Sequence, residues 1–203
     1  NDAIPVTIGS RPPIHESSIT ASHYALDSHA VRKREKGRVH LDGFLSYPSA
    51  VYTVPYGVMV PKEVGNLLLP VPVSGSHIGF STLRMEPCWM AMGQAAGIAS
   101  ALSIDGKVKV QNIDLSRLQD KLIDQKATLM YFKDVDYTSP HFRMVQYLGL
   151  RGYLPEWTAR LQEPVDATTL AAWKKLSGTD LPGIEAGKTT RLATLEMIYR
   201  KIK

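Results

Sequence analysis

The sequence predicts an α/β (α+β) fold, in which a mixed sheet carries one helix of small residues and is followed by a small helical C-terminal module. Three observations predict it. Short β-like runs separated by turn residues occupy residues 14–56. An apolar segment poor in bulky side chains begins at Pro87, and helix-capping residues recur from Asp114 onward.

Composition is that of an ordinary globular protein. The chain has 203 residues, of which 44% are hydrophobic and 21% charged, which suits one domain or two small ones. Composition shifts near Met130. We therefore predict two domains, residues 1–130 and 131–203.

The strand predictions rest on alternation and on buried-type apolar runs. Turn residues separate the alternating runs, which is typical of antiparallel or mixed sheets. Short continuous apolar runs bounded by Pro or Gly are typical of buried strands. The predicted strands are residues 18–26, 38–41, 50–54, 58–60 and 67–69.

The small-residue helix begins at Pro87 and ends at Asp105-Gly106. Proline suits the first helical position, because its missing N–H would have no partner there anyway. Gly93 and Gly97 lie four residues apart inside this helix, and each costs about 1 kcal/mol relative to alanine. The usual gain for that cost is close approach of another backbone or of a flat ligand.

Four further helices are predicted after it. Asp114 is a suitable N-cap for a helix with an apolar stripe through Leu122. A second helix covers residues 141–148 and ends at Gly149. A third is capped by Thr168 or Thr169 and runs to Lys175, and the last is capped at 189–190 and runs to about Ile202.

Several classes of site are not expected. The net charge of +5 is modest, and its densest run, residues 32–38, lacks aromatic stacking residues, so no nucleic-acid partner is predicted. Cys88 is the single cysteine, which excludes a disulfide framework. The histidines have no metal-ligand spacing, so no metal is predicted. Residues 88–104 are short for a membrane span and contain polar residues, so a buried helix is predicted there.

Four motifs in order carry a family resemblance. They are V-P-Y-x-x-x-V-P-K (54–62), E-V-G-N-L-L (63–68), S-G-S-H (74–77) and R-M-E-P-x-x-M-A-M-G-Q-A-A-G (84–97). Over residues 15–125 the chain resembles the C-terminal part of FAD-dependent oxidoreductases, most closely a bacterial group labelled xanthan lyase. In that family the N-terminal end of the small-residue helix faces the flavin ring, so the resemblance implies a flavin-facing helix and FAD as cofactor.

One part of the family pattern is missing. No G-x-G-x-x-G occurs, and the strand, loop and helix that hold the ADP half of FAD are absent from the chain. The resemblance therefore implies the C-terminal piece of a longer protein, whose partner is the N-terminal FAD-binding half. We expect FAD in the full-length protein, and we expect the chain alone to be colourless and inactive.

The resemblance also implies catalytic residues. It places the loop of His77 and Arg84 on the substrate side of the flavin, where histidine moves protons and arginine stabilises an anionic flavin or substrate. Alternatively His77 bonds a backbone carbonyl, and Arg84 pairs with Glu86. His29, in Asp27-Ser28-His29, either faces the flavin or lies on a solvated strand.

The predicted cofactor contacts are Met92, Gly93, Gln94, Ala95 and Gly97. If flavin docks here, backbone N–H groups approach the pyrimidine end of the ring, where negative charge gathers on reduction. The alternative is tight packing of the same small face against the sheet. The implied reaction is hydride transfer from a substrate C–H bond to flavin, with a small molecule or a carbohydrate as substrate.

Two other functions stay open. A polysaccharide lyase of the xanthan type would use Tyr56, His77 and Arg84 as base and carboxylate neutraliser. Residues 131–203 weakly resemble a single S-layer-homology module, which implies a non-catalytic binding module at an extracytoplasmic surface. Its basic and aromatic residues are either polymer contacts or a helical core. An uncovered apolar face on the small-residue helix would favour a homo-oligomer.

Overall fold

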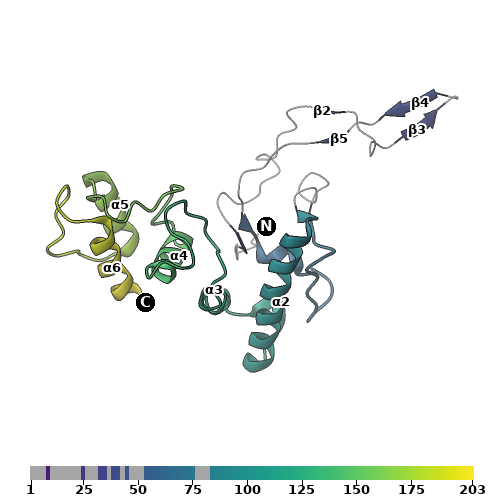
Figure 1. Ribbon diagram of the computed structural model, residues 1–203. Helices are drawn as coiled ribbons and strands as arrows, with labels where there is room; N and C mark the ends of the chain where they lie inside the picture. The colour runs from purple at the N-terminus through teal and green to yellow at the C-terminus, as the bar shows by residue number, and fades with distance from the viewer. Residues whose placement is uncertain are drawn as a thin grey trace. The chain divides into compact units, whose positions relative to one another are not determined.

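The computed structural model describes residues 53–75 and 83–203 with their side chains, and the backbone of five short strands before them (Figure 1). Two compact units divide the chain, and the boundary between their described parts lies between Ile113 and Asp114. We call residues 53–113 the first unit and residues 114–203 the second unit. This division is one of packing, and the predicted domain boundary at residue 130 stays a prediction.

The predicted mixed sheet is wrong for the described residues, which are mostly helical. Their strands are two to four residues long: β1 (Ile8–Gly9), β2 (Tyr24–Ala25), β3 (Arg32–Glu35), β4 (Arg38–Leu41), β5 (Phe44–Leu45) and β6 (Thr53–Val54). β3 pairs with β4 and β2 with β5, both antiparallel. The strand predicted at residues 38–41 is therefore confirmed.

Prolines explain why two of the predicted buried strands do not form. Residues 56–59 instead form the 3-10 helix η2 (Tyr56–Met59), in which the Val60 N–H donates to the Gly57 carbonyl. Residues 67–69 have no regular structure. Prolines at 55, 61, 70 and 72 flank the two runs and lack N–H groups, so a strand ladder cannot extend through these flanking positions. The predictions of strands at 58–60 and 67–69 were wrong because they relied on the apolar runs alone and disregarded the flanking prolines.

The helix predicted from Pro87 is confirmed as α2 (Glu86–Gly106), the long teal helix of Figure 1. Lys107 follows it in the left-handed conformation that closes the C-terminal turn. The chain continues through the 3-10 helix η3 (Val110–Asn112), where the Val110 carbonyl accepts a hydrogen bond from the buried Tyr56 hydroxyl at 2.9 Å. This bond fixes the segment after α2 to the 3-10 helix before it.

The second unit contains α3 (Leu115–Asp124), α4 (Phe142–Leu150), α5 (Ala167–Ser177) and α6 (Arg191–Ile202). Asp114 caps α3 as predicted, and Thr190 caps α6 as predicted. The cap of α5 is Asp166, and the prediction of Thr168 or Thr169 was wrong. Thr169 donates both its N–H and its hydroxyl to the Asp166 carboxylate, so it is the partner of the cap. The same bonds lower the pKa of Asp166.

A separate hydrophobic core holds the second unit together. Trp173 is 2% exposed, and its indole N–H donates to the Tyr153 carbonyl at 2.7 Å. The buried Gln146 side chain accepts from the N–H groups of Leu129 and Met130 and donates to the Met130 carbonyl. These bonds pair buried backbone groups that would each cost about 1–3 kcal/mol if left unsatisfied.

Candidate functional site

α2 has one buried and one exposed side. Its buried residues are Met92, Ala95, Ala96, Ala99 and Leu102. The exposed side follows a spacing of four and three residues, and comprises Met90, Gln94, Gly97, Ala101 and Ile104. Met90 is 74% and Ile104 76% exposed. We call these five residues the open face of α2. A stripe with this spacing is suited to contact a second flat or helical surface.

Gly93 and Gly97 have no side chains, so the backbone of α2 is uncovered at these two positions. A Cβ atom built on either glycine meets no heavy atom of the described residues within 4 Å. Trp89 lies four residues before Gly93, so the three positions follow one line along the helix. The Trp89 indole nitrogen is buried and has no hydrogen-bond partner among the described residues. The line Trp89–Gly93–Gly97 therefore combines an unpaired donor with space for close approach.

Alanine in place of either glycine is expected to stabilise the chain by up to about 1 kcal/mol, because alanine is the better helix former and its Cβ has space here. Chemical denaturation of Gly93→Ala and Gly97→Ala checks this. Gly178→Ala is the control, since Gly178 has φ +61° and alanine is strained there. Loss of stability at Gly93 or Gly97 would show that the helix surface is packed and contradict our description.

The predicted cofactor-contact residues lie on different sides of α2. Met92 and Ala95 are 0% exposed and point into the core, whereas Gln94 and Gly97 are exposed and Gly93 is half-buried. α2 begins at Glu86, and only the first four N–H groups of a helix lack helical partners. Backbone N–H groups from Met92 onward are therefore engaged within the helix. A flat ligand can therefore approach the helix closely at the glycines, but its hydrogen bonds must come from groups other than these backbone N–H groups.

The predicted catalytic residues are only partly described. Arg84 is exposed and lies two residues before α2, and it forms no ion pair with Glu86, both being described residues. His77 and His29 lie outside the described residues, so their roles stay predictions. Within residues 53–75 and 83–203, no group of three metal-ligating side chains occurs, and no helix there is long and apolar enough to cross a membrane.

Tyr56 is poorly suited to the base role that a lyase would require. Its ring is 5% exposed, and its hydroxyl donates to the Val110 carbonyl. Burial raises the pKa of Tyr56 to about 12. Its phenol therefore stays protonated near neutral pH, and its proton is already committed to a backbone acceptor.

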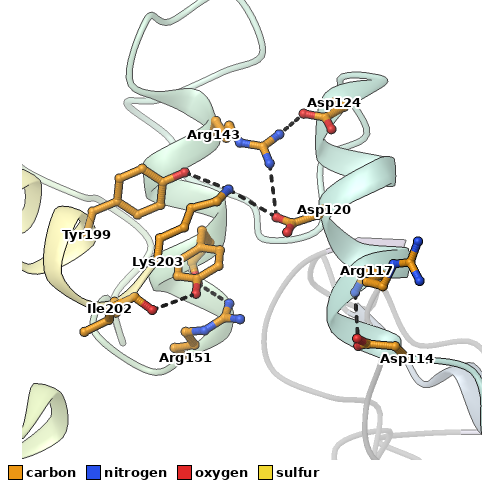
Figure 2. Close-up of polar contacts among 10 residues, drawn as sticks. Asp114, Arg117, Asp120, Asp124, Arg143, Arg151, Tyr199, Ile202 and Lys203 are labelled. Carbon is orange, nitrogen blue, oxygen red and sulfur yellow. Dashed lines mark hydrogen bonds and ion pairs between the residues drawn. The ribbon is translucent and has the colours of Figure 1, made fainter.

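A polar network in the second unit, which sequence reasoning missed, joins three helices (Figure 2). Arg143 of α4 pairs with Asp120 and Asp124 of α3, and Lys203, which follows α6, lies 3.5 Å from Asp120. The Lys203 ammonium also donates to the Tyr199 hydroxyl at 3.1 Å. The two aspartates lie four residues apart, so they share one helix face. This spacing is the sequence feature from which the network could have been predicted. This network links α3, α4 and the C-terminal end of α6 at the protein surface.

Most of the basic and aromatic residues of the second unit that could contact a polymer instead pack against other residues of that unit. Tyr147 packs edge-on against Tyr199, with the Arg151 guanidinium 3.4 Å from its ring centre. Phe132 and Tyr153 are both 3% exposed. The alternative of a helical core therefore accounts for most of these side chains.

Comparison with known proteins gives one match. A family model described as FAD dependent oxidoreductase matches residues 10–122, which is more than half of the chain and includes all of α2. No curated protein and no solved structure matches the chain. The resemblances to a xanthan lyase group and to an S-layer-homology module stay predictions.

Proposed function

Because the chain belongs to the FAD-dependent oxidoreductase family, we propose that it supplies the flavin-facing helix and the substrate side of an FAD-dependent oxidoreductase site. Family membership supports an oxidoreductase-type function for the protein. The observation that carries the finer proposal is the line Trp89–Gly93–Gly97 on α2, where, among the described residues, a buried indole N–H lacks a partner and two glycines leave open space.

These residues fit a flavin ring. A flat aromatic ring packs closely only where side chains are absent, and Gly93 and Gly97 provide such a surface one helical turn apart. In the proposal the buried Trp89 indole N–H, which has no hydrogen-bond partner among the described residues, donates to an acceptor atom of the ring. When bound, FAD would accept a hydride from a substrate C–H bond.

Charge at the start of α2 suits an electron-rich partner. The positive end of the helix dipole lies at Glu86, and the exposed Arg84 adds a full positive charge just before it. In the proposal Arg84 stabilises an anionic substrate or the developing negative charge of the ring, and His77 moves a proton. The Glu86 carboxylate in the first turn opposes part of this field.

In this proposal the part of the open face from Met90 to Ala101 contacts the N-terminal FAD-binding half. This part extends about 16 Å along the helix, at 1.5 Å per residue. The Met90 side chain is 74% exposed, and contact with that half would bury its apolar surface. The pyrophosphate-binding glycine loop is absent from the chain, so we propose that the chain alone holds FAD weakly or not at all.

Absorbance spectra test the proposal. The natively purified full-length protein is expected to show a flavin spectrum, and the chain purified beside it is expected to be colourless. A full-length variant lacking residues 131–203 is the control for the binding-module alternative, and it should keep the spectrum. Absence of flavin from the full-length protein, even after FAD is added, would contradict the proposal.

A further inference from the structure

An open hollow lies at the C-terminal end of α2, away from the flavin-facing line. Its volume is about 470 Å³, and all its lining residues belong to the first unit. Gly93 and Lys107 are separated by about 21 Å of helix, at 1.5 Å per residue. The residues that carry the argument are Asn66, Ser103, Ile104, Lys107, Val108 and Lys109.

The lining is positively charged. Lys107 and Lys109 contribute two ammonium groups, and the described lining includes no acidic residue. Neither lysine forms an ion pair with another residue of the described ranges. An anion bound in this hollow would be attracted by both positively charged side chains.

Backbone and side-chain bonds fix the walls. The Lys107 N–H donates to the Ile104 carbonyl at 3.1 Å, and the Val108 N–H donates to the Ser103 carbonyl at 3.0 Å. The Ser103 hydroxyl donates to the Val108 carbonyl at 2.5 Å. Asn66, which also lines the hollow, has φ +57°, and its N–H donates to the Gln111 side chain. These bonds hold the backbone of the lining at residues 66, 103, 107 and 108 in place.

Lysine is an unusual residue for position 107. It has φ +50°, in the left-handed region that favours glycine and costs other residues about 1–2 kcal/mol. Lys126 has a similar φ of +65°, and its ammonium lies 5.9 Å from the Phe142 ring centre. Among the described residues Lys107 has no such ring contact. An anionic ligand in the hollow would pair with the positive charge of Lys107.

Apolar surface lies beside the two charges. The Ile104 side chain is 76% and the Val108 side chain 41% exposed, and both line the hollow. We propose that this hollow binds a small organic carboxylate with a short aliphatic chain. The carboxylate lies between the ammonium groups of Lys107 and Lys109, the Asn66 amide is within the same lining, and the aliphatic chain covers Ile104 and Val108. This site is distinct from the flavin-facing line and does not depend on it.

Amide chemical shifts of the chain, titrated with hexanoate, test the proposal. Saturable shifts are expected at Asn66 and at residues 103–110. Hexan-1-ol lacks the charge and inorganic phosphate lacks the aliphatic chain, so each is expected to bind at least about tenfold more weakly. Shifts that increase linearly without saturation would overturn the proposal. Equal affinity for hexanol or for phosphate would also overturn it.

Matched variants locate the site. Lys107→Gly keeps the left-handed turn and removes one charge, and Lys109→Gln removes the other. Each is expected to weaken hexanoate binding by about tenfold, the cost of one charged contact. Lys126→Gly is the control, because it replaces a lysine of similar φ that does not line the hollow. Unchanged affinity in both Lys107→Gly and Lys109→Gln, or an equal loss in Lys126→Gly, would overturn the assignment.

Discussion

Leucine at Gly93 or at Gly97 in the full-length protein is expected to remove most of the bound flavin. Each leucine would occupy the space that the glycines leave open along α2, and forcing a side chain into a packed contact costs about 1–3 kcal/mol. Affinity for FAD should therefore fall by about 10–100-fold. The ratio of flavin to protein absorbance after gel filtration measures the loss.

Two comparisons separate loss of the site from loss of the fold. Gly65→Leu is the matched control, because Gly65 also has nothing within 4 Å of a built Cβ and lies outside α2. It should keep normal flavin content. In the chain alone, Gly93→Leu and Gly97→Leu should be at least as stable to denaturant as the unsubstituted chain, because leucine is a better helix former than glycine. Full flavin content in both leucine variants would rule out ring contact at these glycines.

Trp173→Ala is expected to destabilise the second unit by about 3–5 kcal/mol. The ring is 2% exposed in the core, and its loss leaves the Tyr153 carbonyl without its indole donor. The Arg191 guanidinium, 5.0 Å from the ring centre, would also lose its aromatic neighbour. Burial removes water from around the Arg191 charge and thereby lowers the pKa of Arg191. Chemical denaturation followed by circular dichroism measures the change.

Trp157→Ala is the control for this variant. Trp157 is only half-buried and packs edge-on against Tyr131, so its removal should cost clearly less. The family match ends at residue 122, before the core that Trp173 stabilises. Full-length Trp173→Ala protein should therefore keep its flavin spectrum. Loss of flavin from this variant would show that the second unit takes part in holding the cofactor.

Helix positions could be predicted from the sequence because helix ends have local chemical signals. Asp114 accepts hydrogen bonds from the N–H groups of Ser116 and Arg117, and Thr190 caps α6 in the same way. Such caps need no tertiary partner. The strand predictions failed where they depended on pairing, because the N–H groups of Val58 and Val60 donate to the nearby carbonyls of Pro55 and Gly57 and form a 3-10 turn.

The open face of α2 could be predicted only in part. The two glycines indicated close approach of another group. However, alanines and glycines occur on every side of the helix, so hydrophobicity does not distinguish its buried side from its exposed side. Packing decides that Ala95 is buried and that Gly97 is exposed. The hollow at Lys107 was not predictable, because it requires Asn66 and the end of α2 to meet in three dimensions.

The central claim is that a flavin ring lies against the line Trp89–Gly93–Gly97. A crystal structure of the flavin-loaded full-length protein measures this most directly. It should place the ring in van der Waals contact with Gly93 and Gly97, and an acceptor atom within hydrogen-bonding distance of the Trp89 indole nitrogen. A ring bound elsewhere, with protein side chains covering both glycines, would contradict the account.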